Sequence, residues 1–290
     1  MNRKMIFLAV TALVLVSLAC SININLPDIQ TKTGPTVTDD IIVPLLTDNQ
    51  AIADVTMNFG AGKLNLQPGA TGVLLKGTAT YNVADFKPKI TTDSNNINIE
   101  QGNVMLTGIP TIGSNVINEW NLSLGESPMS LAIKAGAYEG TIELGGLSIH
   151  KLDVTDGASK VKLSFSKPNL VEMTELKYTT GASTVSLTGL ADANVSDLTF
   201  NGGAGSYTLD FGGKLQHDMN VTIEAGVSSI TVIIPEGTNA LVITDNGLSS
   251  VATSGSWQQN GNNYQLAGTG STITIHVKLG AGSLRLETGK

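Results

Sequence analysis

The sequence predicts an all-β protein built as a β-solenoid, a ladder of similar coils stacked along one axis. The 290 residues include 32 glycines and only 4% aromatic residues, and no sustained helical stripe of apolar residues follows residue 20. Apolar and polar residues alternate on both sides of recurring glycines, as they do in strands. Five of these glycines lie 21, 24, 22 and 23 residues apart, a period typical of solenoids: Gly136, Gly157, Gly181, Gly203 and Gly226.

The repeat has the form Φ-x-Φ-x-x-Gly-small-x-x-Φ-x-Φ, where Φ is an apolar residue. In its clearest copy Leu152 and Val154 precede Gly157, and Val161 and Leu163 follow it. Each copy predicts two short strands joined at a corner, where glycine can adopt a backbone conformation closed to residues with a Cβ. The copy at residue 136 reaches its second apolar pair two residues late. Seven glycines are the expected structural corners of coils of about 22 residues: Gly60, Gly136, Gly157, Gly181, Gly203, Gly226 and Gly280.

Counting from each glycine predicts which side chains share a column of the ladder. Val161, Val185, Tyr207 and Ile230 should form one inward column, and Leu163, Leu187, Leu209 and Val232 should form its neighbour. The same count places four polar residues in an outward line with few charges. We interpret this line as a possible contact face: Lys162, Ser186, Thr208 and Thr231.

The first 19 residues are expected to be a signal peptide, because Arg3 and Lys4 precede an apolar run from Met5 to Val16. The run is shorter than the roughly 20 residues that span a bilayer. Cys20, the only cysteine, follows this run and resembles the acylated cysteine of a bacterial lipobox, although Ser17 stands where leucine is usual. We therefore expect a lipid anchor at Cys20. The alternative is an ordinary signal peptide in which this cysteine is incidental.

The remaining chain is predicted to form a flexible tether and one solenoid. Residues 20–45 are polar and contain prolines, which is typical of a tether, and residues 46–290 follow as a single β-solenoid. The repeats extend to about residue 245, and residues 244–290 are expected to be an irregular C-terminal cap. Trp257 and Tyr264 lie in this region. They are expected to cover the last coil, with a carbohydrate-stacking surface as the alternative.

An ordered series of short motifs resembles the N-terminal portion of the bacterial toast-rack family, also called DUF2154. The series runs over about residues 50–245 and includes 60–66 (GAGKLNL), 120–124 (WNLSL), 145–147 (GGL), 157–159 and 181–183 (both GAS), and 202–205 (GGAG). The part from about 50 to 150 carries the first of these motifs. The resemblance implies a β-solenoid on an extracytoplasmic bacterial protein. The chain is also similar to the C-terminal region of LiaF-type envelope-stress proteins, and neither resemblance supplies a catalytic residue.

Charge and residue spacing argue against several classes of function. The formal charge of −7 becomes −9 if residues 1–19, with two cations and no acids, are removed, so nucleic acid is not expected as a partner. The three histidines lack the spacing of metal ligands, and no cofactor or metal is expected. In the aligned repeats no two acids fall on adjacent coils at one register, as an acid/base pair would require. Asp153 with Asp156, and Glu172 with Glu175, are interpreted as solvated turn charges.

The sequence therefore predicts a non-enzymatic cell-envelope lipoprotein that acts as a structural or adhesin-like binding module. Its partners would be the membrane, through the lipid anchor, and an envelope protein or glycan. Two other functions stay open, a sensor component that relays envelope stress to a membrane partner and a carbohydrate-active enzyme on a β-helix. The expected location is outside the cytoplasm, anchored to the cell membrane or envelope.

Overall fold

The structure is a computed structural model that describes residues 33–48, 51–102, 115–245 and 250–289, all within one compact unit. These residues form a 16-stranded sheet, and their one helical segment is the 3-10 helix η1 (Ala84–Phe86). The prediction of an all-β solenoid is confirmed. The predicted signal peptide over residues 1–19 and the predicted lipidation at Cys20 lie outside the described residues.

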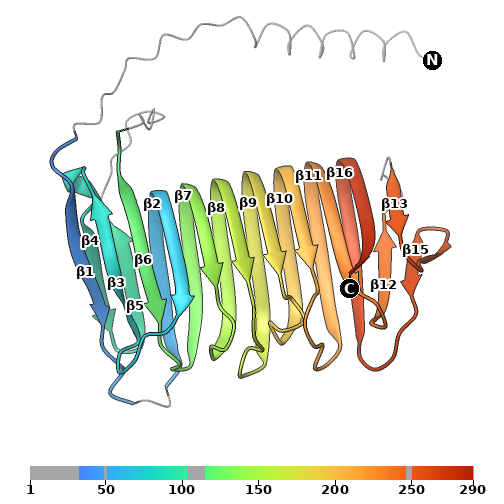
Figure 1. Cartoon of the computed structure of the whole chain (residues 1–290), viewed down its shortest axis with the longest axis horizontal. Helices are drawn as coiled ribbons and strands as arrows, with labels where there is room; N and C mark the ends of the chain where they lie inside the picture. Colours follow the sequence, from blue (N-terminus) through green and yellow to red (C-terminus); the bar gives the residue numbers. More distant parts are fainter. Residues whose placement is uncertain (1–32, 49–50, 103–114, 246–249, 290) are drawn as a thin grey trace, which may run out of the picture. The chain divides into compact units, whose positions relative to one another are not determined.

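Five central rungs form the body of the ladder (Figure 1). They are β7 (Met129–Glu143), β8 (Ile149–Ser164), β9 (Met173–Thr188), β10 (Val195–Asp210) and β11 (Met219–Pro235). Each rung is one long strand that bends at its glycine, so the expectation of two short strands per copy is wrong. Parallel pairing resumes directly beyond the bend because neighbouring rungs bend at the same register.

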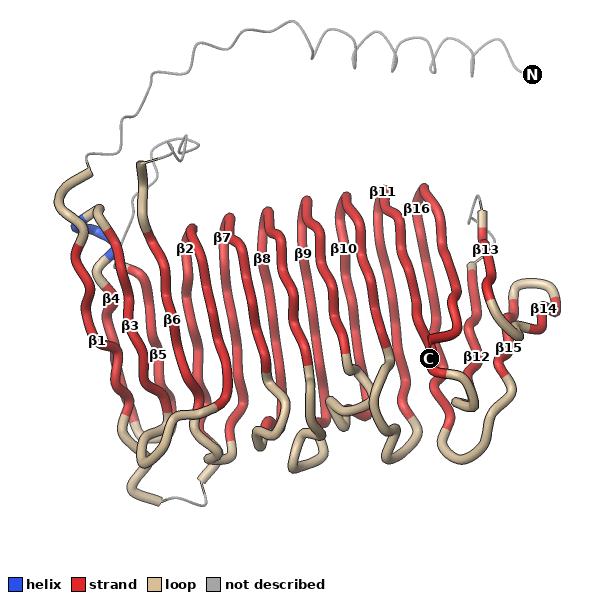
Figure 2. Tube along the Cα trace, viewed as in Figure 1, coloured by secondary structure: helices blue, strands red, loops and turns tan. Residues whose placement is uncertain are grey.

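The residues of a rung before its glycine are called the first arm, and those after it the second arm. The bends together form the glycine edge, and loops join successive rungs at the opposite edge (Figure 2). Along each arm, buried side chains alternate with side chains that are exposed or half-buried. The buried side chains of both arms form one hydrophobic core that runs through the whole ladder.

The predicted inward columns are present in sequence order. Val161 pairs with Val185, Val185 with Tyr207, and Tyr207 with Ile230. The neighbouring column pairs in the same order and is also fully buried: Leu163, Leu187, Leu209 and Val232. Paired strands lie about 4.8 Å apart, so each column is a continuous stack of apolar side chains.

The order of rungs differs from the order of the sequence at both ends of the ladder. Strand β2 (Ala53–Pro68) pairs directly with β7, and β16 (Thr272–Gly289) lies between β11 and β12 (Asn239–Thr244). The chain between these long strands and the central rungs forms the outer layers at each end. The period therefore weakens in sequence while the ladder itself continues without a break.

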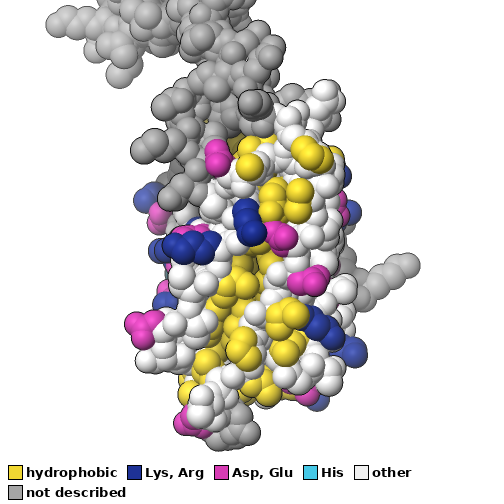
Figure 3. All heavy atoms as spheres, turned by 90° about the vertical axis from the view of Figure 1, so that its left-hand side faces the viewer, with side chains coloured by type: hydrophobic (Ala, Val, Ile, Leu, Met, Phe, Trp, Pro, Cys, Tyr) yellow, Lys and Arg dark blue, Asp and Glu magenta, His cyan; other side chains and the backbone are white. Residues whose placement is uncertain are grey.

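The N-terminal end is built from short strands outside β2. On the second arm the order is β6 (Asn118–Leu124), β3 (Leu75–Tyr81) and β1 (Val37–Val43), and on the first arm it is β5 (Asn96–Gln101) and β4 (Pro88–Asp93). Strand β1 begins inside the expected tether of residues 20–45, which is therefore too long as predicted. At this end hydrophobic side chains gather between charged flanks (Figure 3).

The C-terminal cap spans about residues 239–266, so it both begins and ends earlier than the predicted range of residues 244–290. It consists of β12, β13 (Val251–Ser254), β14 (Gln258–Asn260) and β15 (Asn263–Leu266). Strands β12 and β13 each pair with one arm of β16, and β15 and β14 extend the sheet beyond β12 as an antiparallel hairpin. Strand β16 itself is a full rung around Gly280, as the repeat pattern indicates.

Tyr138 explains the imperfect copy around Gly136. Gly140 occupies the column position of Val161, and a Cβ on Gly140 would lie 2.7 Å from the Tyr138 ring. The ring of Tyr138 therefore fills the core space that an aliphatic side chain fills in the other rungs. Its ring centroid lies 6.2 Å from that of Phe59 on β2.

Candidate functional site

The four residues of the expected contact face lie in one outward row on the second arms. Lys162 of β8 pairs with Ser186 of β9, Ser186 with Thr208 of β10, and Thr208 with Thr231 of β11. The row continues to Arg285 of β16. Lys162 and Arg285 are exposed, and the three hydroxyl residues are half-buried. The structure thus brings these side chains together on one surface of the ladder.

A second outward row lies beside the first, two residues closer to the glycine edge. Its five members are all exposed, and two of them, Ser229 and Ser283, have hydroxyl oxygens 3.3 Å apart. From β8 to β16 this row reads Lys160, Thr184, Ser206, Ser229 and Ser283. We call the two rows together the hydroxyl face. It contains seven Ser and Thr side chains, three cations and no carboxylate.

Carboxylates occur only at the borders of the hydroxyl face. Glu139 of β7 is paired in register with Lys160, and Asp210 and Glu287 follow on the side of the loops. Arg285 lies near Glu287, with 3.7 Å between Nε and Oε1. Lys160 and Lys162 have no ion pair within the described residues.

The outward face of the first arms has a different character, because its charges neutralise one another. Lys151 of β8 and Glu175 of β9 are 2.5 Å apart, and Glu224 of β11 and Lys278 of β16 are 4.0 Å apart. The hydrogen bond to Glu175 raises the pKa of Lys151. The ladder therefore presents a self-paired charged face on one side and the hydroxyl face on the other.

One pair of acids does share a register on adjacent rungs. Asp197 of β10 pairs with Glu175 of β9, so the expectation that no such pair exists is wrong. The pair falls six residues before the glycine, a position that the comparison of the repeats did not include. Glu175 is bound to Lys151, and Asp197 accepts a hydrogen bond of 3.3 Å from Asn220. Both carboxylates thus have a partner on a neighbouring rung.

Asp156 is buried inside the glycine edge, which corrects its interpretation as a solvated turn charge. Its relative exposure is 6%, whereas Asp153 is half-buried and points outward. The carboxylate accepts hydrogen bonds from the hydroxyls of Tyr178, Thr180 and Ser159. Burial of a charge requires such donors, because an unpaired carboxylate in the core is very costly.

The hydroxyl groups around Asp156 continue the network across two rungs. Ser183 bonds to Thr180 at 2.6 Å and to Ser159 at 3.0 Å. Burial and the nearby carboxylate raise the pKa of the phenols of Tyr138, Tyr178 and Tyr207 above the ordinary value. The cluster is closed to solvent, and its groups stabilise the neutral phenols. Its chemistry is therefore that of a structural hydrogen-bond network.

The corner glycines form a column in which successive backbones approach closely. A Cβ on Gly181 would lie 2.4 Å from the carbonyl oxygen of Gly157, and one on Gly203 would lie 2.5 Å from that of Gly181. At Gly226 the corresponding distance to Gly203 is 2.8 Å. None of the seven corner glycines has a positive φ, which belongs instead to Gly62, Gly205 and Gly282, two residues further on. The corners thus require glycine for close approach, and the expected special conformation is absent there.

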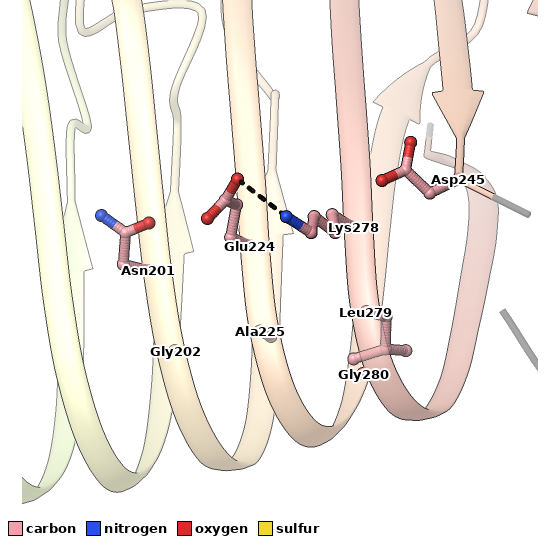
Figure 4. A pocket seen from close by; sticks show the side chains of 8 residues that line it. All are labelled: Asn201, Gly202, Glu224, Ala225, Asp245, Lys278, Leu279 and Gly280. Carbon is pink, nitrogen blue, oxygen red and sulfur yellow. Dashed lines mark ion pairs between the residues drawn. The ribbon is translucent and has the colours of Figure 1, made fainter. Parts of the chain in front are cut away.

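A shallow groove of about 540 Å³ lies beside the glycine edge of β10, β11 and β16 (Figure 4). Its floor contains Gly202, Ala225 and Leu279, and Glu224 and Lys278 lie along one wall. This space is open because Gly202 has no side chain and Ala225 has only a methyl group. Behind Gly202 the ring of Tyr207 closes the core, since a Cβ there would be 2.5 Å from it.

The other predicted site residues do not meet at one place. Tyr264 is 6% exposed and accepts a hydrogen bond from Gln259, so its ring is a buried part of the cap. Trp257 packs against the core and is partly buried. Within the described residues no group of His, Cys, Asp and Glu side chains could hold a metal ion, and no helix has the length and apolar character of a membrane span.

The model of the N-terminal domain of toast_rack, DUF2154, matches residues 31–172 and 169–233 of the chain. This match covers more than half of the sequence. The chain belongs to the toast-rack family. A comparison of this toast-rack protein with curated proteins gave no match.

The chain is also similar to solved structures at low sequence identity. A Clostridium sporogenes protein, provisionally named as a cell adhesion protein, is 20% identical, with a TM-score of 0.50 over 88% of this chain and 100% of its own. A Bacteroides fragilis protein, provisionally named as an adhesin, is 12% identical, with a TM-score of 0.49 over 87% of this chain and 97% of its own. At such identities the first likeness concerns the fold alone.

Proposed function

We propose that this toast-rack protein is a non-enzymatic, adhesin-like binding module of the bacterial cell envelope, and that the hydroxyl face is its contact surface. The observation that carries the proposal is the in-register pairing of Lys162, Ser186, Thr208 and Thr231 on four consecutive rungs. Parallel rungs hold such side chains about 4.8 Å apart on a rigid sheet. A rigid, regularly spaced surface binds with little loss of conformational entropy.

Family membership and fold likeness support the same reading. The toast-rack fold is shared with the Clostridium sporogenes protein that carries a cell-adhesion name. The chain's first residues support a location at the membrane, because Cys20 follows a short apolar run. We propose that lipid attached to Cys20 anchors the ladder. A single acyl chain binds a membrane only marginally, whereas two or more acyl chains give a stable anchor.

Thr208→Glu provides the test, with Thr199→Glu as the matched control. Both threonines lie on β10 and are half-buried, but Thr208 belongs to the hydroxyl face and Thr199 to the first arm. Full-length protein would be incubated with native envelope material, and the captured components would be quantified. We expect Thr208→Glu to reduce capture at least about tenfold, because a bulky charge at the centre of an interface disrupts its contacts. Equal capture by the two variants would exclude the hydroxyl face as the contact surface.

A carbohydrate-active enzyme is the second candidate, and the Glu175 and Asp197 pair is the observation that favours it. Acids on adjacent rungs can serve as general acid and base when substrate reaches both. Here Lys151 and Asn220 already bind the two carboxylates. A Glu175→Gln/Asp197→Asn variant separates the two functions. It should capture envelope material as well as the wild type if the protein is a binding module.

A further inference from the structure

The hydroxyl face is cationic although the protein is acidic. The chain has a formal charge of −7, yet the two rows of this face carry three cations and no carboxylate. Lys160 and Lys162 are two residues apart on one arm, so both side chains point outward from the same rung. Arg285 is compensated by Glu287, with 3.7 Å between Nε and Oε1, so the charge that favours an anionic partner is that of Lys160 and Lys162.

The cations lie at the two ends of the hydroxyl rows. Lys162 on β8 and Arg285 on β16 are four rung steps apart in the same row, which corresponds to about 19 Å. Between them lie the hydroxyls of three rungs. A hydroxyl both donates and accepts hydrogen bonds, which matches the hydroxyl groups of a sugar chain. The face thus fits an extended polar ligand that crosses the rungs and carries negative charge.

The arrangement does not fit other extended anions equally well. Peptides usually add to a sheet by main-chain hydrogen bonds at an exposed edge, whereas this surface is a broad face that offers side-chain hydroxyls. Single-stranded nucleic acid is bound through aromatic stacking and dense cationic charge, and neither row contains an aromatic residue. A sugar chain with separated charges needs neither feature.

We propose that the hydroxyl face binds a linear polysaccharide that carries carboxylate groups, with the chain running from Lys160 and Lys162 toward Arg285. This inference rests on the proposed function and names the partner of the same surface. The lysines attract the carboxylates, and the Ser and Thr hydroxyls bond to the sugar hydroxyls between them. Binding is expected to weaken with rising salt, because exposed charges are screened beyond about 10 Å at 0.1 M.

The test uses polygalacturonate, with its fully methyl-esterified form as the neutral control on the same sugar backbone. Full-length protein in detergent would be titrated with each polymer at low and high salt. We expect tight binding to the free acid only, and a loss of at least about tenfold for Lys160→Glu/Lys162→Glu. Thr208→Val should weaken binding about threefold, since it removes one hydroxyl but keeps the strand. Lys177→Glu, on the first arm, should have no effect.

Each contrary result overturns the inference in a distinguishable way. Equal binding of the two polymers would exclude recognition of carboxylates. Equal binding of polyglutamate, with no effect of Thr208→Val, would reduce the interaction to charge attraction and exclude a sugar ligand. Absence of binding to polygalacturonate, with capture of envelope material still sensitive to Thr208→Glu, would overturn this inference and leave the proposed function standing. If Thr208→Glu also has no effect on capture, the proposed function fails as well.

Discussion

The carboxylate of Asp156 on β8 accepts a hydrogen bond of 2.7 Å from the phenol of Tyr178 on the next rung. Both residues are buried, so the bond links two rungs inside the core. The positions that follow Tyr178 and Thr180 on β10 are Phe200 and Gly202, which have no hydroxyl. A rung exchanged or shifted by one step would leave the carboxylate of Asp156 without its two donors on β9, Tyr178 and Thr180. The network therefore specifies which rung neighbours β8, which similar apolar columns alone would not do.

Replacement of Asp156 by alanine should destabilise the protein by about 3 kcal/mol, because three buried hydroxyls lose their acceptor. The matched control is Asp153→Ala on the same strand, whose side chain points outward. That variant should stay within about 0.5 kcal/mol of the wild type. Urea unfolding of both variants measures the difference. Similar stabilities for the two would mean that the buried network contributes nothing.

Alkaline pH should also destabilise the ladder. Burial raises the pKa of Tyr138 and Tyr178 in the folded protein above the ordinary value of 10.0. A raised folded pKa gives stability that is fully present below pH 10 and is lost as pH rises beyond it. Burial, with help from Asp39, likewise raises the pKa of Tyr81, to about 12. The free energy of unfolding should therefore fall above pH 10, and less steeply in Tyr178→Phe. Parallel curves for variant and wild type would contradict the role of this phenol.

The sequence was sufficient to predict the columns but not the contents of the glycine edge. Val161 and Leu163 recur at fixed distances from a glycine, and this count alone predicts their neighbours. Asp156 occupies a position that also faces inward, but the type of residue at this position differs from rung to rung. From β2 to β16 it reads Phe59, Ala135, Asp156, Thr180, Gly202, Ala225 and Leu279. Nothing in one copy therefore marks this position as buried.

The repeat pattern also could not predict the order of the rungs at the two ends of the ladder. Gly60 and Gly136 are 76 residues apart in sequence, yet β2 and β7 pair directly. A chain can insert strands between two rungs in sequence and still place them outside in space. The repeat count cannot distinguish these arrangements, because each strand keeps its own alternation. The outward row of Lys162, Ser186, Thr208 and Thr231 could be predicted because it depends only on register within the central rungs.

Glu143 at the end of β7 should make stability depend on acid pH. Burial alone would raise its pKa, but hydrogen bonds from the Ser164 hydroxyl and from the N–H groups of Ser166 and Gly145 outweigh burial and lower it. A lowered pKa in the folded protein gives stability that is present above the ordinary pKa of 4.5 and is lost as pH falls through the folded-state pKa. Glu143→Gln should therefore cost most near pH 6, and its cost should shrink toward pH 3. A cost that is constant over this range would assign the effect to packing.

Lipid attachment predicts that Cys20 decides where the protein is found. Cys20→Ala should move the protein from the membrane fraction to the soluble fraction, because the acyl chains supply the anchor. Mass spectrometry of the N-terminal peptide measures the modification directly. Ser17→Leu restores the usual lipobox residue and serves as a control that should keep the protein in the membrane. A Cys20→Ala protein that remains in the membrane fraction would rule out the anchor.

The last prediction concerns the glycine column, where neighbouring positions should differ in their tolerance of a methyl group. A Cβ on Gly181 would lie 2.4 Å from the carbonyl oxygen of Gly157, whereas one on Gly157 would lie 3.0 Å from that of Gly136. The obstacle is backbone in both cases, so it cannot move away as a flexible side chain would. Neither glycine has a positive φ, and the cost of alanine is therefore steric and not conformational.

Gly181→Ala should accordingly destabilise the protein by more than about 1 kcal/mol relative to Gly157→Ala, since overpacking against fixed backbone costs 1 to 3 kcal/mol. Gly237→Ala is a control of the opposite kind, because it has open space but a φ of +81°. Its cost should reflect backbone conformation only, roughly 1 kcal/mol. Denaturant unfolding of the three variants gives the ranking. Gly157→Ala could instead prove as costly as Gly181→Ala. The difference of 0.6 Å (3.0 − 2.4) between the two distances from Cβ to carbonyl oxygen would then have no energetic effect. In that case the column would accommodate both methyl groups through the same small shift of the rungs.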